Sequence, residues 1–355
     1  MDATVSRLDA ERVLEPLRLS GEASGSDGID DMIDVHGPIL VGVPCHCEIG
    51  PPLNGRSDPA QVGLEAPDRR LGCGRADGDY AGKVSDNASS TAKVLLSTSS
   101  VYPETTASGF ELAAALGYDG VELMVGIDPV AADIDAVEKL RDYHEVPVHA
   151  VHAPCLLVTQ RTWGDDPWEK LAMSAKAAAR LGADTVVVHP PFRWQGTYAS
   201  GFEAGIRRLN EDSGVRFCVE NMYPWRTPVR NFKAYLPGWD PSDLDYEYLT
   251  LDLSHASTAR VQSLDLAKSW GDRLRHLHLT DGDGSAVDEH LLPGQGDQRA
   301  DEVLAHLLES GFDGHVVLEV NTRSIGSRGA REHALADALA FTRTHLGQLA
   351  DAQAS

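Results

Sequence analysis

The chain has 355 residues, and 31 Lys and Arg stand against 54 Asp and Glu, which gives a formal net charge of −23. It contains no run of about 18 apolar residues, which excludes a membrane-spanning helix, and its first residues contain no apolar signal segment. Five cysteines without paired spacing do not form a disulfide framework. We therefore expect a cytoplasmic protein that is compatible with a homo-oligomer. The acidity disfavours nucleic acid as a partner without excluding it.

The first 90 residues differ from the rest in composition. Gly, Pro and Ser fill 27 of these positions, and Tyr80 is the only aromatic residue among them. A segment with so few large apolar side chains cannot offset its ordering entropy by burial. The run Cys45-His46-Cys47 fits no usual spacing of zinc ligands, so we interpret it as part of a loop. We predict that residues 1–90 form a low-complexity, disordered segment and that residues 91–350 form the functional domain.

From Lys93 onward, short β-branched or apolar runs alternate with amphipathic stretches. The predicted strands are Val94–Thr98, Gly120–Met124, Pro147–His152, Thr185–His189, Arg216–Glu220, Tyr248–Asp252, Leu274–Leu279 and His315–Glu319. The predicted helices are Ser108–Leu116, Ile134–Tyr143, Trp168–Leu181, Gly201–Asn210, Arg299–Ser310 and Arg331–Leu346. Eight strand–helix units over about 260 residues are typical of a (β/α)8 TIM barrel, an α/β fold with a closed parallel sheet. A doubly wound open sheet is the alternative, although the chain lacks the glycine-rich motifs of the usual nucleotide folds.

Three similar links join predicted helices to the strands that follow them. They are Leu-Gly-Tyr-Asp-Gly at 116–120, Leu-Gly-Ala-Asp at 181–184 and Ser-Gly-Phe-Asp-Gly at 310–314. Each link places Gly directly after the helix, and glycine readily adopts the left-handed conformation that ends a helix. The links therefore predict helix ends at Leu116, Leu181 and Ser310.

Residue types that bind metals stand at the ends of six predicted strands. They are His152, His189, Glu220, Asp252, His278 and Glu319. Barrel active sites form at the carboxyl ends of the strands, so these side chains should converge on one mouth. Burying so many ionisable groups without a cation would cost several kcal/mol for each of them. Because imidazole and carboxylate together suit Zn²⁺, Mn²⁺ or Fe²⁺, we predict a divalent-metal site.

Three more candidate ligands lie just beyond strand ends: His255, Asp288 and His290. Two further ionisable residues are expected near this site without being predicted as ligands. Glu122 either reaches the mouth or makes a structural hydrogen bond near the rim. His276 precedes His278 by two positions, so it faces the same side of its strand at a deeper level.

Aromatic and basic residues in the loops after the strands are candidate substrate contacts. Trp194 and Trp225 belong to a group of aromatic residues that either wall a sugar pocket or pack the loops. Arg193, Arg226 and Arg323 lie in the same kind of loop, where a phosphate or carboxylate of a substrate would need them. We predict all five as substrate-binding residues.

Seven short motifs follow one another along the barrel region. They are HAP at 152–154, HPP at 189–191, EN at 220–221, DLSH at 252–255, HLTD at 278–281, DEH at 288–290 and LEV at 318–320. In this order they resemble the xylose isomerase-like superfamily of TIM barrels, over about residues 93–346. That superfamily includes sugar-phosphate isomerases and epimerases and also the endonuclease IV family of abasic-site nucleases. The resemblance implies a barrel enzyme that binds one to three ions of Zn²⁺ or Mn²⁺.

The endonuclease IV pattern implies a three-metal cluster. Glu220 would bridge two metals, one also held by His152 and His189 and the other by Asp252, His278 and Glu319. The third metal would be held by His255, Asp288 and His290. Clustered metals of this kind activate a water and clamp a phosphate. The family's motif has a basic residue where Glu289 stands here, so this loop has gained a negative charge.

The isomerase and epimerase pattern implies a single divalent metal. Its ligands would be Glu220, Asp252, His278 and Glu319. The metal polarises a ketose carbonyl and its adjacent hydroxyl, and the catalytic residues Glu220 and Glu319 remove and return a proton through an enediolate. The predicted function is therefore a divalent-metal-dependent sugar or sugar-phosphate isomerase or epimerase. An endonuclease IV-type abasic-site nuclease or phosphodiesterase is the alternative.

Overall fold

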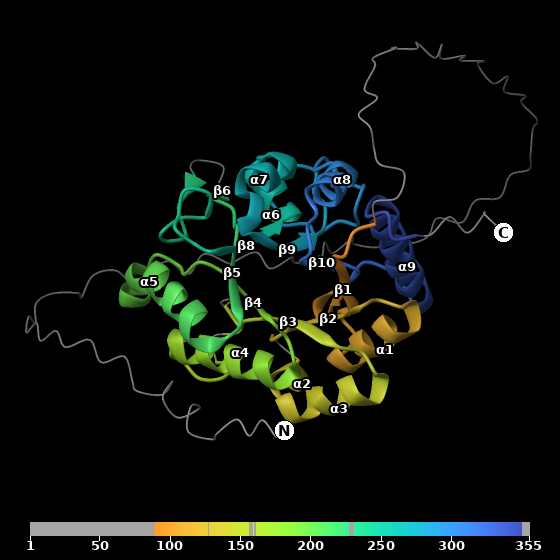
Figure 1. Cartoon of the computed structure of the whole chain (residues 1–355), viewed down its shortest axis with the longest axis horizontal. Coiled ribbons are helices and arrows are strands. Elements are labelled where there is room, and N and C mark those ends of the chain that lie inside the picture. Colours follow the sequence, from red (N-terminus) through yellow and green to blue (C-terminus); the bar gives the residue numbers. More distant parts are fainter. Residues whose placement is uncertain (1–88, 127, 156–158, 160, 227–230, 350–355) are drawn as a thin grey trace, which may run out of the picture. The chain divides into compact units, whose positions relative to one another are not determined.

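Eight parallel strands close into a barrel in the order β1-β10-β9-β8-β5-β4-β3-β2 (Figure 1). The computed structural model describes residues 89–126, 128–155, 159, 161–226 and 231–349. The barrel strands are β1 (Lys93–Ser97), β2 (Gly120–Met124), β3 (Val148–His152), β4 (Thr185–Val188), β5 (Arg216–Glu220), β8 (Tyr248–Asp252), β9 (Leu274–Leu279) and β10 (His315–Leu318). The closed parallel sheet confirms the predicted (β/α)8 barrel and excludes the open sheet. The segment predicted to be disordered spans residues 1–90, of which residues 1–88 lie outside the described residues, whereas Ser90 is described and donates a backbone hydrogen bond to Leu346.

Helices lie around the outside of the barrel (Figure 1). They are α1 (Thr106–Leu116), α2 (Pro129–Ala132), α3 (Ile134–His144), α4 (Pro167–Leu181), α5 (Gly196–Ser213), α6 (Leu253–Ala259), α7 (Ser263–Trp270), α8 (Ala300–Ser310) and α9 (Arg328–His345). The six predicted helices are all present, and α2, α6 and α7 are additional short ones. An antiparallel pair, β6 (Trp225–Arg226) and β7 (Asn231–Phe232), also lies between β5 and β8 in the chain. Among the described residues, no helix combines the length and the apolar character needed to cross a membrane.

The predicted helix ends are confirmed by the backbone. Gly117, Gly182 and Gly311 follow α1, α4 and α8 with φ of 80°, 80° and 71°, the left-handed conformation that glycine adopts without steric cost. At the other end of α4, the side chain of Asp166 accepts hydrogen bonds from the N–H groups of Trp168 and Glu169. The ends of these three helices and the start of α4 are therefore encoded locally.

Alternate residues of the strands pack on opposite sides of the barrel wall. One set, for example Leu277 and Leu279 of β9, joins the hydrophobic core between the sheet and the helices. The other set, for example His276 and His278, is fully buried but stands outside that core. Because neighbouring residues of a strand face opposite sides, these histidines fill the inside of the barrel. The barrel interior thus becomes polar below its mouth.

Candidate metal centre

The six residues predicted at strand ends come together at the carboxyl end of the barrel. His152, Glu220 and Asp252 are the last residues of β3, β5 and β8, and His278 is the penultimate residue of β9. His189 and Glu319 directly follow β4 and β10. All six are buried. Parallel strands of one barrel end on the same side, and residues far apart in the chain therefore meet there.

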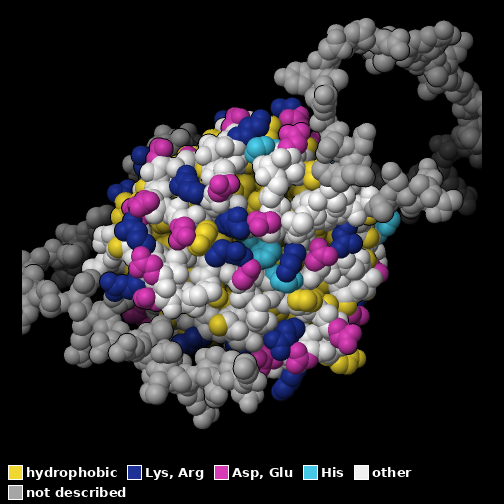
Figure 2. Space-filling model, in the orientation of Figure 1, with side chains coloured by type: hydrophobic (Ala, Val, Ile, Leu, Met, Phe, Trp, Pro, Cys, Tyr) yellow, Lys and Arg dark blue, Asp and Glu magenta, His cyan; other side chains and the backbone are white. Residues whose placement is uncertain are grey.

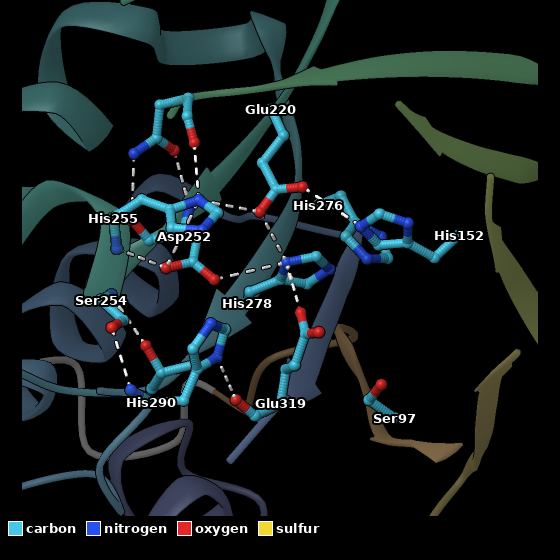
Figure 3. A network of polar contacts seen from close by, with 12 residues as sticks. Ser97, His152, Glu220, Asp252, Ser254, His255, His276, His278, His290 and Glu319 are labelled. Atoms are coloured by element: carbon cyan, nitrogen blue, oxygen red, sulfur yellow. Dashed lines mark hydrogen bonds and ion pairs between the residues drawn. The ribbon is translucent and has the colours of Figure 1, made fainter. Parts of the chain in front are cut away.

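Glu220 occupies the centre of this cluster (Figure 3). Its Oε2 lies 3.3 Å from Nε2 of His152 and 3.0 Å from Nε2 of His189. Its Oε1 lies 3.1 Å from Nδ1 of His278 and 3.2 Å from Nδ1 of His255. One carboxylate therefore contacts four imidazoles from four different segments of the chain.

The ring nitrogen Nδ1 of His278 faces three carboxylates. It lies 3.1 Å from Glu220 Oε1, 2.9 Å from Glu319 Oε2 and 3.5 Å from Asp252 Oδ2. Oδ2 of Asp252 is buried and has no hydrogen-bond partner among the described residues. A buried carboxylate oxygen without a partner carries a large desolvation cost. A divalent cation bound between these four side chains would remove that cost, so the residues fit the metal that the sequence predicts.

The three outer candidates form a second group beside the first. Asp288 Oδ2 lies 3.1 Å from Nε2 of His255 and 3.0 Å from Nε2 of His290. Nδ1 of His290 donates a hydrogen bond to the backbone oxygen of Glu319 (2.8 Å). The hydroxyl of Ser254 donates to Asp288 Oδ1 (2.6 Å) and accepts from the N–H groups of Glu289 and His290 (Figure 3). All nine predicted metal ligands therefore lie in one continuous cluster.

Three sets of ligand atoms at the mouth are close enough to share an ion. They are His152 with His189 and Glu220, Glu220 with Asp252 and His278, and Asp252 with His255 and His290. Within each set the ligand atoms lie within 4.8 Å of one another. The mixture of imidazole and carboxylate suits Zn²⁺, Mn²⁺ or Fe²⁺ rather than Mg²⁺ or Ca²⁺.

Several residues that hold the ligands in place were not predicted from the sequence. Asn221 pairs with the backbone of Asp252, accepting from its N–H (2.7 Å) and donating to its carbonyl oxygen (3.1 Å). Ser254 joins the helix α6 to the loop of Asp288, as described above. Asn221 follows Glu220 in the EN motif, and Ser254 precedes His255 in the DLSH motif. Their position next to predicted ligands was the sequence signal that could have identified them. Glu122 is fully buried beneath the mouth and hydrogen-bonds the β9 histidines. Of the two alternatives for Glu122, the structure therefore shows the structural hydrogen bond.

The charges in the cluster shift one another's pKa values. Burial alone would raise the pKa of Glu220, but the neighbouring histidines outweigh burial and hold this pKa well below 4.5. Burial alone would lower the pKa of His290, but Asp288 and Asp252 raise it to about 10. Burial also opposes a charge on His278, yet Glu319 and the other carboxylates hold its pKa well above 6.5. At neutral pH, protons on His278 and His290 therefore balance part of the carboxylate charge of the metal-free cluster.

These shifts predict how the stability of the metal-free protein depends on pH. The contribution of His290 to the free energy of unfolding is complete below about pH 6.5, the pKa of histidine in the unfolded chain, and is lost as the pH rises towards 10. The contribution of Glu220 is complete above about pH 4.5, the pKa of glutamate in the unfolded chain, and is lost as the pH falls through the lowered pKa of the folded state. We expect the metal-free melting temperature to be highest between these limits. Melting curves in chelator from pH 4 to 10 test this, and a melting temperature that rises from pH 6.5 to 9 would contradict it.

Two of the predicted substrate contacts, Trp194 and Trp225, belong to an aromatic wall with Phe192. The side chain of Trp194 is 51% exposed and stacks on Phe192, with ring centroids 4.6 Å apart. The ring centroid of Trp225 lies 5.9 Å from that of Trp194. Arg193 is exposed and lies over the ring of Phe232, and Arg323 is exposed and lies over the ring of Tyr102. The side chain of Arg226 lies outside the described part of the chain.

A cavity of about 550 Å³ opens beside the metal centre. His189 and Trp194 line it, together with Trp168, Gln195 and Tyr198. Its size falls within the range of about 300–1,000 Å³ that is usual for small-molecule sites. The aromatic wall thus forms part of a cavity that reaches a predicted metal ligand, whereas Arg193 and Arg323 do not line it.

Comparison with known proteins gives the family. Residues 110–345 match the family described as xylose isomerase-like TIM barrel. An uncharacterized protein of Mycobacterium tuberculosis is 50% identical over 273 residues, which cover 72% of this chain and 98% of that protein. Fructoselysine 3-epimerase of Escherichia coli O157:H7 is 38% identical over 236 residues, which cover 60% of this chain and 84% of the epimerase. The crystal structure of a D-tagatose 3-epimerase-like protein superposes with a TM-score of 0.52 at 25% identity, covering 71% of this chain and 98% of that one. The chain therefore belongs to the xylose isomerase-like TIM barrel family.

Proposed function

We propose that this protein is a divalent-metal-dependent epimerase or isomerase of ketose sugars or their phosphates. The observation that carries the proposal is the position of Glu220 and Glu319, which approach Nδ1 of His278 from two different strands, 3.1 and 2.9 Å away (Figure 3). Two carboxylates on either side of one ligand are what a two-base proton transfer requires. The similarity to fructoselysine 3-epimerase and to a D-tagatose 3-epimerase-like protein supports a sugar substrate.

The ligands of the metal would be Glu220, Asp252, His278 and Glu319. When bound, the metal would polarise the carbonyl and adjacent hydroxyl of a ketose and so acidify the C–H bond beside them. Because its pKa lies well below 4.5, Glu220 is ionised at neutral pH and able to accept a proton. Glu319 is oriented by the hydroxyl of Ser99, which donates to its Oε1 at 3.4 Å. One carboxylate removes the carbon-bound proton, and the other returns a proton to the opposite face of the enediolate.

The cavity beside His189 would hold the rest of the sugar. Trp194 offers an exposed ring face, and Trp225 stands next to it. A sugar ring or chain stacks on such a surface through its apolar C–H face. We propose that both residues bind the sugar, and that Arg193, Arg226 and Arg323 meet a charged end of the substrate.

The Trp194→Ala variant tests this assignment. We expect KM for the sugar to rise about tenfold with little change in kcat, because the stacking contact is the same in the ground and transition states. Steady-state kinetics with the preferred ketose measure both constants. A fall in kcat at unchanged KM would show that Trp194 acts in the reaction rather than in binding.

The function itself is tested by proton exchange. The full chain, loaded in turn with Mn²⁺, Zn²⁺ and Co²⁺, is incubated in D₂O with a set of ketohexoses and their phosphates. We expect deuterium to enter the carbon beside the carbonyl and an epimer to form, both visible by NMR. If protein with verified metal content exchanges no carbon-bound hydrogen in any of these sugars, the proposed reaction is wrong for this substrate class.

A second candidate is a phosphodiesterase or abasic-site nuclease of the endonuclease IV type. The observation that favours it is the presence of two further ligand sets at the mouth. They are His152 with His189 and Glu220, and Asp252 with His255 and His290, the second with Asp252 where the endonuclease IV pattern has Asp288. The charge of −23 opposes it, since DNA affinity comes from cationic contacts. On the face shown in Figure 2, Lys and Arg alternate with Asp and Glu and do not form one basic patch. The charge therefore makes DNA the weaker candidate substrate.

The His255→Ala variant separates the two candidates. In a one-metal epimerase His255 is not a ligand, so we expect the epimerase rate to stay within about tenfold of wild type. In a three-metal hydrolase the same change removes a ligand and costs about 10²-fold or more. His333→Ala, at an exposed histidine of α9, is the matched control. If His255→Ala lowers activity by about 10²-fold or more and the wild-type protein cleaves an abasic-site duplex, the second candidate is established instead.

The assignment to the cytoplasm is also a proposal. Cys155 and Cys218 carry free thiols, which agrees with a reducing compartment.

A further inference from the structure

A buried carboxylate lies below the metal centre on the other side of the barrel interior. Glu122 belongs to β2, which is separated from β9 in the closed sheet by β1 and β10. Its side chain is fully buried. Oε2 of Glu122 lies 2.8 Å from Nε2 of His276, and its two oxygens lie 3.2 and 3.4 Å from Nε2 of His278. One carboxylate thus spans the barrel and meets both inward-facing histidines of β9.

We propose that Glu122 is a positioning residue that fixes the tautomer and ring orientation of the metal ligand His278. This inference rests on the metal site of the proposed function. An ionised carboxylate only accepts hydrogen bonds, so the contact with Glu122 requires the proton of His278 to be on Nε2. Nδ1, on the other side of the ring, is then the nitrogen whose lone pair would bind a metal held between Glu220, Asp252 and Glu319. The metal-binding nitrogen is therefore selected by a residue that is not itself a ligand.

Glu122 is itself held in place by His276. The Nε2 of His276 donates to the same carboxylate at 2.8 Å, and the two rings of β9 pack edge to face with centroids 5.2 Å apart. With both histidines donating to it, the carboxylate has one orientation that satisfies both bonds. Carboxylates that accept from the second nitrogen of a ligand histidine raise its basicity and fix its direction, and their loss weakens metal affinity about 10- to 100-fold.

A purely structural role for the same hydrogen bonds makes a different prediction. If Glu122 only satisfies two buried donors, its replacement lowers the stability of the apoprotein and leaves the metal affinity of the folded fraction unchanged. If Glu122 selects the tautomer, the affinity itself falls. Metal affinity and the spectrum of the bound metal are therefore the decisive readouts.

The test is a Co²⁺ titration of the full chain carrying Glu122→Gln. Glutamine keeps the shape, but its NH₂ group must face one of the two histidines, which favours a proton on the wrong nitrogen. The matched control is His315→Asn, at a buried histidine of β10 whose ring centroid lies 5.5 Å from that of His276. Affinity is measured by competition with a chelator, and coordination by the visible absorption of bound Co²⁺. Apoprotein melting curves confirm that each variant is folded.

We expect Glu122→Gln to bind Co²⁺ about 10- to 100-fold more weakly with an altered spectrum, while His315→Asn keeps wild-type affinity and spectrum. Equal affinities in Glu122→Gln and wild type, or equal losses in both variants, would overturn the inference. If Glu122→Gln does not fold, His276→Leu removes the donor that holds Glu122 in place. It should then bind Co²⁺ more weakly than His315→Asn does, and an affinity equal to that control would also overturn the inference.

The outcomes also separate this inference from the proposed function. Wild-type protein that binds no divalent metal overturns both. Wild-type protein that binds Co²⁺ and epimerises a sugar, with Glu122→Gln indistinguishable from it, overturns the positioning role alone. Weaker binding in Glu122→Gln by a protein that epimerises no sugar supports the positioning role and removes the proposed reaction.

Discussion

Glu220→Gln protein is expected to lose the epimerase rate by about 10³-fold or more. The change removes a charge that contacts four histidines, and it replaces a proton acceptor by an amide that cannot take a proton. Loss of general base catalysis alone costs about 10²- to 10⁴-fold, and the weakened metal site adds to this loss. The measurement is kcat/KM for the preferred ketose, with the metal content of each preparation determined beforehand.

Glu289→Gln provides the matched control for that experiment. Glu289 is a carboxylate of the same mouth, and its Oε2 accepts a hydrogen bond from the backbone N–H of Asp283 at 2.9 Å. We expect this variant to keep the wild-type rate. Full activity in Glu220→Gln protein would contradict both the epimerase and the phosphodiesterase schemes, because Glu220 is central to each.

Removing the metal is expected to abolish activity and to lower the melting temperature by about 8–16 °C. An ion present at 1,000 times its dissociation constant stabilises the folded state by about 4 kcal/mol, and each kcal/mol shifts the melting temperature of a domain of this size by about 2–4 °C. The physical cause is that, without the metal, the three carboxylates around Nδ1 of His278 have only histidine protons as counter-charge, and Oδ2 of Asp252 stays buried with no hydrogen-bond partner among the described residues. Melting curves and activity are compared before and after dialysis against a chelator.

Reloading identifies which ion the site accepts. We expect Mn²⁺ or Zn²⁺ to restore activity and melting temperature, and Mg²⁺ to restore neither, since His278 offers a nitrogen that Mg²⁺ binds poorly. If the melting temperature is the same with and without metal, while metal analysis confirms complete removal and reloading, the four ligands do not form the site described above.

The barrel could be predicted from the sequence because its signals are local. Every barrel strand lies within one residue of its predicted range, since each is a short segment rich in apolar or β-branched residues between turns and helices. The glycine after α4 ends its helix regardless of what packs against it. Helix α6 was missed for a physical reason: all seven of its residues are buried, polar and apolar alike, and it therefore has no solvent-exposed face and no amphipathic pattern.

The sequence predicted that the strand-end residues lie close together, but it did not predict their mutual contacts. His152, Glu220 and Asp252 could be predicted together because a closed parallel barrel brings all its strand ends to one side. The contact of Ser254 with Asp288 could not, because it joins residues 34 positions apart through the path of a loop. The role of Glu122 also depends on a contact across the barrel, over 156 positions of chain to His278.

The amino-acid sequence alone therefore determined the strands, the glycine-capped helix ends and which strand-end side chains meet at the mouth, because each depends on local composition and on the fixed geometry of parallel strands. Only the tertiary structure decided which atoms face one another. It placed Nδ1 of His278 towards three carboxylates and Nε2 towards Glu122. The physical reason is that imidazole has two chemically distinct nitrogens, and only the surrounding side chains determine which of them binds the metal.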